Sequence, residues 1–319
     1  MLQQASPSLG PETVAVEASD LVKDFGDTRA VDGVSLIVPT GSIYGLLGPN
    51  GAGKTTILRM LIGIIDPSSG TRRVLGRERP LETAEDVGYL PEERGLYPAM
   101  QAREAIAFMG ALRGLPLAEG RRRADQLLDE HNLSSWAKKP IRALSKGMAQ
   151  TVQLLGTIIH KPRLIILDEP FAGLDAINQG RLEELIRREA RAGATIIFST
   201  HVIAHAERLC ERVAIIAAGK VAFDGRVDDA RARLRPIVRL RTRANDGPWR
   251  SAIPASARRE GDEWVFEQPD GGPEPLLRAL IDGAAGIETL AIERPGLHDA
   301  FVAIAGSSAA AAMGREKAQ

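Results

Sequence analysis

The sequence predicts an α/β fold built around a mostly parallel β-sheet, followed by a small α+β module. The short apolar runs "RLIILDE", "ATIIFSTH" and "RVAIIAAG" are separated by helical stretches, which is typical of parallel strands covered by helices on both faces. A glycine-rich turn joins another apolar strand to a helix. After about Leu234 the pattern changes to half-exposed strands and short helices.

The N-terminal half begins with a tail, residues 1–12, which we expect to be flexible. The runs "VAVEASDLVKDF" and "GVSLIVPTGSIYGLLG" predict strands broken at turn residues such as Gly26 and Pro39. The segment "KTTILRMLIGII" predicts a helix that ends before Pro67. Between Tyr97 and Leu144 helical periodicity dominates, as in "AREAIAFMGALRG".

Two domains follow from this pattern. Residues 13–232 form the larger one. The smaller spans residues 235–305, with strands at "IVRLRTR", "EWVFEQ" and "GIETLAIE" and helices at "PEPLLRALID" and "GLHDAFVAIAG". This module contains no recognisable chemical motif. We expect residues 306–319 to be a flexible tail.

The composition argues against several classes of protein. Lys+Arg and Asp+Glu are equal at 41 each, whereas a nucleic-acid-binding chain usually carries a basic excess. The longest apolar run, "AIAFMGAL", is too short to span a membrane, and the N-terminus lacks the pattern of a signal peptide. We therefore expect a cytoplasmic chain without a membrane span. The single cysteine, Cys210, is expected to be a small buried apolar residue.

The glycine-rich turn "GPNGAGKTT" satisfies the G-x-x-x-x-G-K-[ST] pattern between a strand and a helix. Backbone N–H groups of such a loop and the positive end of the helix bind phosphate oxygens. Lys54 adds a point charge, and the Thr55 hydroxyl is a suitable ligand for Mg²⁺. The residues predicted to contact the nucleotide here are Asn50, Gly51, Ala52, Gly53, Lys54, Thr55 and Thr56.

The strand "RLIILDE" ends in two adjacent carboxylates. We predict that Asp168 helps to hold Mg²⁺ and that Glu169 orients and polarises the water that attacks the terminal phosphate. A second anion-binding turn lies at "LSKGM". Ser145 can cap the following helix there, and Gly147 allows an oxyanion to approach the backbone.

The ordered set "GPNGAGKTT", "LSKGM", "LIILDEP", "AGLD" and "FSTH" resembles the ATP-binding cassette (ABC) ATPase family over about residues 13–230. The resemblance is highly specific because several motifs occur in the family's order. It implies an ATP-hydrolysing P-loop domain with antiparallel β and helical subdomains, which uses ATP and Mg²⁺.

The resemblance also implies roles for individual residues. His201 matches the switch histidine that contacts the γ-phosphate. Phe25 matches the aromatic side chain that stacks on adenine, with Val31 beside it. Asp175 matches the residue that couples two nucleotide sites. Two copies would pack head to tail, and one copy would clamp the nucleotide of the other through Ser145, Lys146 and Gly147.

Two positions depart from the family pattern. The turn "LSKGM" has Lys146-Gly147-Met148 where Gly-Gly-Gln is common, and the lysine brings positive charge toward the phosphate. Glu92 replaces a glutamine that touches Mg²⁺ and reports to the membrane subunit. A glutamate is still an oxygen ligand, but it adds negative charge. Glu93 is the alternative sensor, and both glutamates could instead contact only the partner.

The segment "LPEERGLYP", together with "LSKGM" and the C-terminal "ERPGLHDAFVAIAG", resembles the ATPase subunits of sodium or drug exporters. This implies a separate integral-membrane permease subunit, a second copy or homologous ATPase subunit, and a location at the cytoplasmic face of the cell membrane. Substrate identity is not encoded here. His201 and His205 are four residues apart, but His201 ends a strand, so we expect no metal site there.

Two alternatives remain. A soluble mechanical ATPase acting on nucleic acid or ribosomes is disfavoured because the chain has one cassette, no coiled-coil insertion and no net charge. A non-catalytic ATP-binding regulator is disfavoured by Glu169 and His201, although Glu92 leaves it open.

Overall fold

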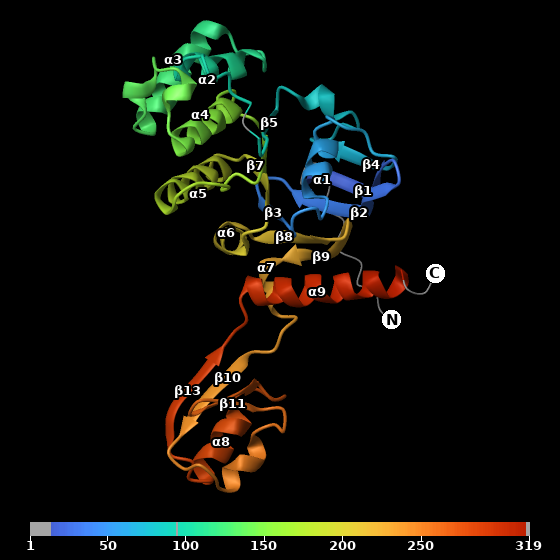
Figure 1. Ribbon diagram of the computed structural model, residues 1–319, viewed down its shortest axis with the longest axis vertical. Coiled ribbons are helices and arrows are strands. Elements are labelled where there is room, and N and C mark those ends of the chain that lie inside the picture. Colours follow the sequence, from blue (N-terminus) through green and yellow to red (C-terminus); the bar gives the residue numbers. More distant parts are fainter. Residues whose placement is uncertain (1–13, 94, 317–319) are drawn as a thin grey trace. The chain divides into compact units, whose positions relative to one another are not determined.

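The structure is a computed structural model that describes residues 14–93 and 95–316 of the 319-residue chain. The tail expected over residues 1–12 therefore lies outside the described residues. The chain divides into two compact units (Figure 1). Unit 1 comprises Met1–Arg226 and Ile304–Gln319, and unit 2 comprises Val227–Ala303. Along the described residues, no helix is long and apolar enough to cross a membrane.

Unit 1 is organised around a six-stranded sheet. Five of its strands are parallel, and the last is antiparallel to its neighbour. The predicted runs "RLIILDE", "ATIIFSTH" and "RVAIIAAG" supply three of the parallel strands, which confirms the predicted sheet. The strand order is β5 (Val87–Leu90), β6 (Leu164–Asp168), β7 (Thr195–Thr200), β3 (Ile43–Leu47), β8 (Arg212–Ala217) and β9 (Lys220–Arg226).

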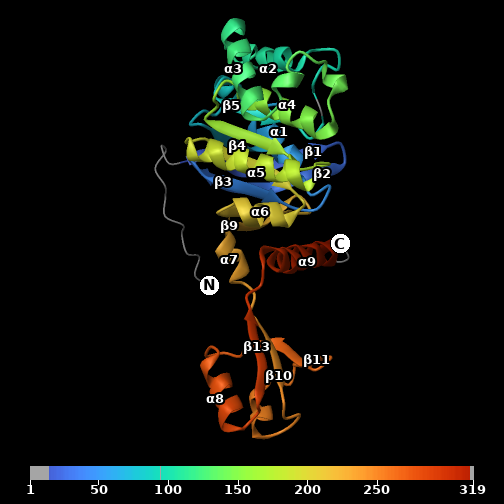
Figure 2. The same cartoon turned by 90° about the vertical axis from the view of Figure 1, so that its left-hand side faces the viewer.

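Helices connect these strands, as Figure 2 shows for α5 and α6. The connecting helices are α1 (Lys54–Leu61), α5 (Ala176–Arg191) and α6 (Ile203–Leu209). An antiparallel sheet packs beside α1 in the order β2 (Thr28–Pro39), β1 (Val14–Phe25) and β4 (Ser69–Val74). Apolar side chains of both sheets and of α1 form one buried core. This core fixes the start of α1 against the carboxyl ends of the parallel strands.

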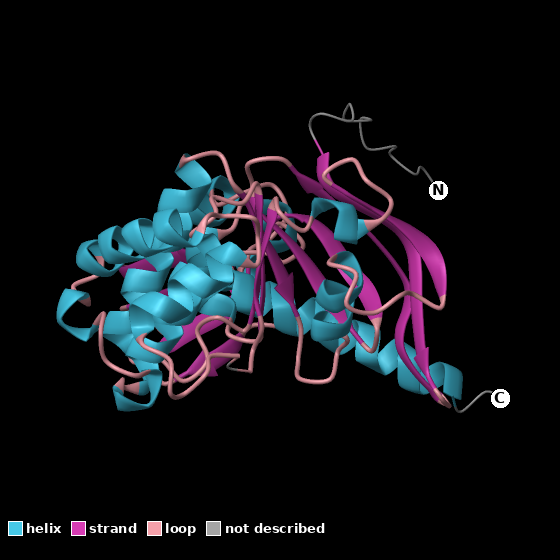
Figure 3. Cartoon of the chain, turned by 90° about the horizontal axis from the view of Figure 1, so that it is seen from above, coloured by secondary structure: helices cyan, strands magenta, loops and turns pink. Residues whose placement is uncertain are grey.

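A helical segment lies on the opposite side of unit 1 from the three-stranded sheet (Figures 1 and 3). Its α-helices are α2 (Ala102–Ala111), α3 (Leu117–Glu130) and α4 (Lys146–Ile158), with short 3₁₀ turns at Ser134–Trp136 and Ile141–Ala143. A further 3₁₀ turn, Pro80–Thr83, lies between β4 and β5. The antiparallel and helical subdomains implied by the family resemblance are thus both present.

Unit 2 is a four-stranded antiparallel sheet with helix α8 (Glu274–Asp282). The strand order is β11 (Arg258–Glu260), β12 (Glu263–Glu267), β10 (Ile237–Thr242) and β13 (Ile287–Glu293). Its core contains the fully buried Trp249. Between β10 and β12, where the sequence predicted no strand or helix, the structure has a 3₁₀ turn, Pro248–Ala252, and β11.

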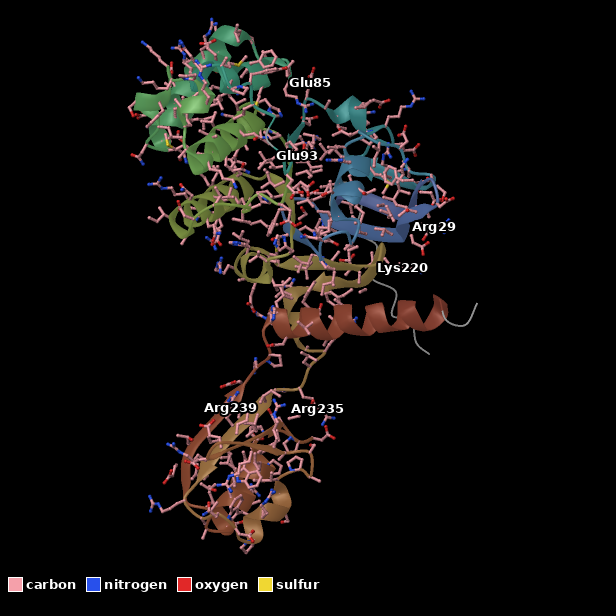
Figure 4. All side chains as sticks on the ribbon, in the orientation of Figure 1. Arg29, Glu85, Glu93, Lys220, Arg235 and Arg239 are labelled. Atoms are coloured by element: carbon pink, nitrogen blue, oxygen red, sulfur yellow. The ribbon has the colours of Figure 1, made fainter. Side chains whose placement is uncertain are left out.

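The sheet of unit 2 also contains charged residues that form ion pairs. Arg239, labelled in Figure 4, pairs with Glu260, Glu263 and Glu293 at distances of 3.1 to 3.6 Å.

Two further helices are α7 (Val227–Arg231) and α9 (Leu297–Glu316). Helix α9 therefore runs past residue 305, where we expected the module to end.

Candidate active site

The glycine-rich loop connects β3 to α1 and depends on two tightly packed glycines. Gly53 precedes α1 with φ 101°, a conformation that residues with side chains rarely adopt. A Cβ atom at Gly53 would lie 2.6 Å from the Ala30 carbonyl oxygen, and one at Gly48 would lie 2.5 Å from that of Ile216. The loop backbone therefore lies directly against neighbouring strands, with its N–H groups at the start of the helix.

Lys54 is held inside this loop. Its side chain is buried, and Nζ donates to the carbonyl oxygens of Gly48 (2.9 Å) and Pro49 (3.1 Å). The same ammonium lies 3.3 Å from Glu169 Oε1. Because a buried ammonium requires a compensating charge, this ion pair links the loop to the end of β6. The remaining predicted loop residues, Asn50, Gly51, Ala52, Thr55 and Thr56, lie on either side of Lys54.

Asp168 ends β6 and is fully buried. Its Oδ1 accepts hydrogen bonds from Thr55 Oγ1 (3.1 Å) and Ser199 Oγ (2.6 Å). Its Oδ2 is buried and has no hydrogen-bond partner within the described residues. An unsatisfied carboxylate oxygen beside a threonine hydroxyl fits a hard divalent cation such as Mg²⁺.

Glu169 is the next residue, in the left-handed backbone region at φ 47°. Its N–H donates to Ser199 Oγ (2.9 Å), and its Oε2 lies 3.0 Å from His201 Nδ1. The His201 side chain is 46% exposed, whereas that of Glu169 is only 8% exposed. The structure therefore brings Lys54, Glu169 and His201 together, with His201 on the open side.

The turn "LSKGM" begins helix α4 as expected. Ser145 caps it by accepting a hydrogen bond from Met148 N (3.2 Å), while the Ser145 and Lys146 side chains are exposed. Lys146 Nζ lies 2.6 Å from the point where a Cβ on Gly173 would be built. In this structure the ammonium therefore lies over the "AGLD" loop of its own chain.

The neighbouring end of α5 contacts the same turn. A Cβ on Gly147 would lie 2.8 Å from Asn178 Nδ2, so a side chain at this buried glycine would collide with α5. Asp175 caps α5 by accepting from Asn178 N (2.9 Å), and Asn178 Nδ2 donates to the other Asp175 oxygen (2.9 Å). Asp175 is exposed.

The structure exposes only one of the two residues, Phe25 and Val31, that we expected near the adenine. Phe25 ends β1 with half of its surface exposed, and Lys23 Nζ lies 5.3 Å from its ring centroid. Val31, by contrast, has no exposed surface, because it packs in the core beside Gly53. The structure thus corrects the expectation for Val31, whose side chain supports the loop and offers no surface to a base.

Glu92 and Glu93 are both exposed in the bend after β5. Leu90 of β5 pairs in parallel register with Leu167 of β6, so this bend leaves the same sheet edge as Asp168. Figure 4 marks Glu93 between the helical segment and the strand-rich part of unit 1. No direct bond joins Glu92 to Asp168 among the described residues.

Sequence reasoning did not identify Ser199 as a contributor to this site, nor did it identify the surroundings of His205. Ser199 bonds both Asp168 and Glu169, and its only signal was a hydroxyl residue beside the histidine in "FSTH". His205 was considered only as a partner of His201. It is instead buried, lies 3.0 Å from Glu183 Oε1, and stacks on Phe171.

Comparison with known proteins agrees with this geometry. A family model described as ABC transporter matches residues 31–172. The uncharacterized ABC transporter ATP-binding protein YhaQ of Bacillus subtilis is 32% identical over 88% of this chain and 95% of the relative. The daunorubicin/doxorubicin resistance ATP-binding protein DrrA of Streptomyces peucetius is 30% identical over 93% of this chain and 94% of its own.

Two further matches cover about two thirds of the chain. The linearmycin resistance ATP-binding protein LnrL of Bacillus subtilis is 34% identical over 69% of this chain and 71% of the relative. A solved ATP-binding subunit of an ABC transporter superposes with a TM-score of 0.64 at 32% identity, covering 69% of this chain and 92% of that one. With the phosphate loop, the paired carboxylates and the exposed histidine assembled as described, the chain belongs to the family of ABC transporter ATP-binding proteins.

Proposed function

We propose that this chain hydrolyses ATP to power a separate integral-membrane permease subunit that works as an exporter. The observation that carries the proposal is the placement of the Glu169 carboxylate, 3.3 Å from Lys54 Nζ and 3.0 Å from His201 Nδ1. A carboxylate held at the end of a phosphate-binding loop can orient a water and accept its proton.

Individual residues of the chain would have the following roles in ATP binding and hydrolysis. The loop N–H groups and Lys54 bind the phosphates, and Phe25 stacks on the base. Thr55 and Asp168 would hold Mg²⁺, which neutralises charge on the phosphates when bound. Glu169 orients the attacking water, and the exposed His201 contacts the terminal phosphate. Glu92 or Glu93 contacts the metal site or the permease.

The exposed turn at Ser145 and Lys146 supports a head-to-tail arrangement with a second copy or a homologous ATPase subunit. The start of α4 offers N–H groups and a lysine to a phosphate carried by another chain. We place this assembly at the cytoplasmic face of the cell membrane. The resistance functions named for DrrA and LnrL support an export direction.

The Glu169→Gln variant tests the catalytic assignment. We expect ATP binding to persist and an ATP-bound dimer to accumulate, while turnover falls by about 10²-fold or more, because the amide cannot accept the proton. Size exclusion with ATP and a phosphate-release assay measure the two effects. Glu184→Gln, on an exposed glutamate of α5, is the matched control. Wild-type turnover by Glu169→Gln contradicts the assignment.

Affinity purification from native membranes tests the transport assignment. Recovery of a polytopic membrane protein with the chain supports the permease partnership. Recovery of ribosomes or DNA in its place would favour a mechanical ATPase, and the transport proposal would then be abandoned while the ATPase site is kept.

A further inference from the structure

We propose that His205 is a positioning residue for Glu169 and acts through the ring of Phe171. The inference rests on the ATPase function proposed above, because it assigns Glu169 to the reaction. His205 touches none of the residues that we expect to contact ATP. It would act by fixing the turn that follows Glu169.

That turn requires support from outside. Glu169 has φ 47°, a backbone conformation that is strained for a residue with a side chain and persists only where neighbouring contacts impose it. The turn is closed by Ala172 N donating to Glu169 O (3.1 Å) and by Leu174 N donating to Phe171 O (3.3 Å). Both bonds lie within the turn itself, so they do not anchor it to the sheet.

Beyond the bond from Glu169 N to Ser199, the side chain of Phe171 anchors the turn. Its side chain is buried, and its ring meets the edge of Phe198 at a centroid distance of 5.9 Å and an interplanar angle of 79°. The Phe171 ring also stacks on the imidazole of His205, with a centroid distance of 3.9 Å and an interplanar angle of 8°. Phe198 directly precedes Ser199, which bonds Asp168 and Glu169. The Phe171 ring is therefore held between α6 and the strand that supports both carboxylates.

The His205 ring is itself fixed by charge. Its Nδ1 lies 3.0 Å from Glu183 Oε1 on α5, and both side chains are buried. Arg208 donates to the same carboxylate through Nη2 (2.6 Å) and Nε (3.0 Å). Burial alone would raise the pKa of Glu183, but the hydrogen bonds from Arg208 and His205 outweigh it and lower that pKa. An ionised Glu183 thus orients the imidazole face toward Phe171.

Three variants of the full-length chain separate the ring from its hydrogen bond. His205→Ala removes both, His205→Gln keeps a donor toward Glu183 without the ring, and His205→Phe keeps an aromatic face without the donor. His160→Ala is the matched control. His160 is a half-buried histidine located before β6, at the opposite end of that strand from Asp168.

Two readouts are measured: ATPase kinetics per ATP-binding site, and hydrogen exchange of the Ala172 and Leu174 amides. For His205→Ala and His205→Gln we expect kcat to fall by about tenfold or more with the KM for ATP within about threefold, since the phosphate loop is untouched. Exchange at both amides should accelerate. In His205→Phe both readouts should recover to within about threefold of wild type, and His160→Ala should match wild type.

The proposal is overturned if His205→Ala retains wild-type kcat per site, or if His205→Phe is as impaired as His205→Ala. A uniform loss of stability with unchanged kcat per site would likewise show that His205 is only a core residue. If the wild-type chain hydrolyses no ATP while the exchange results follow the expected order, the proposed function fails and the support of the turn by His205 stands.

Discussion

Replacement of Gly53 by alanine is the sharpest test of how the phosphate loop is built. Gly53 has φ 101°, and an alanine Cβ at this position would lie 2.6 Å from the Ala30 carbonyl oxygen. The contact is with backbone, so no side chain can rotate away to relieve it. Either the loop or strand β2 must shift, and the shift moves Lys54 at the start of α1.

The size of the effect follows from two terms. A residue with a Cβ in the left-handed region costs about 1–2 kcal/mol. Overpacking against backbone adds about 1–3 kcal/mol, so Gly53→Ala should destabilise unit 1 by about 2–5 kcal/mol. Gly41→Ala is the matched control, because Gly41 has φ 73° and no atom lies within 4 Å of the point that its Cβ would occupy. Gly41→Ala should lower the stability only by the cost of the left-handed backbone conformation, about 1–2 kcal/mol.

Calorimetry measures the loss of stability. The unfolding transition that belongs to unit 1 is the one whose temperature rises when ATP is added. Isothermal titration measures ATP affinity, which should fall by about tenfold or more in Gly53→Ala because Lys54 moves. Gly41→Ala should bind ATP as wild type does. Equal stability and equal ATP affinity of the two variants would refute the steric argument.

Two further predictions concern carboxylates. Glu92→Gln should leave ATP binding intact and change the Mg²⁺ dependence of turnover, because a neutral amide replaces a charge near the metal site. Glu184→Gln, on the exposed face of α5, is its control. An unchanged metal dependence in Glu92→Gln removes Glu92 from that site. Asp224 is the second: burial raises its pKa above 3.8 even though Tyr44 donates to it at 2.9 Å. The folded state then binds this proton more tightly than the unfolded state, so the contribution of Asp224 to stability decreases as pH rises from 3.8 through the raised pKa. Asp224→Asn should abolish that decrease in calorimetric scans over the same pH range.

The sequence predicted most of the parallel sheet, and the residues that it singled out at the phosphate loop and after β6 lie together in the structure. Buried parallel strands require nearly continuous apolar runs, and "RLIILDE" and "ATIIFSTH" are runs of this kind. The phosphate loop is equally local, since its glycines and Lys54 are adjacent in the chain. Ser145 as a helix cap was readable for the same reason, because a cap depends on residues three positions apart.

Contacts between distant segments could not be read in this way. Val31 was placed beside the base, but the packing of β2 on the loop buries it completely. His205 and Glu183 are separated by a strand and a turn, and nothing local indicates that α5 and α6 bring them within 3.0 Å. Strand β11 escaped prediction because its three residues, Arg258–Glu260, are all exposed and charged.

The hydroxyl of Ser199 has a consequence for protein engineering. It has a single hydrogen, which it donates to Asp168, and it accepts the N–H of Glu169 with a lone pair. One hydroxyl group thus supports two neighbouring residues to which we assign different roles, Asp168 in metal binding and Glu169 in orienting the attacking water. Alanine or valine at position 199 would therefore remove both bonds at once, and the supports of Asp168 and Glu169 would be lost together.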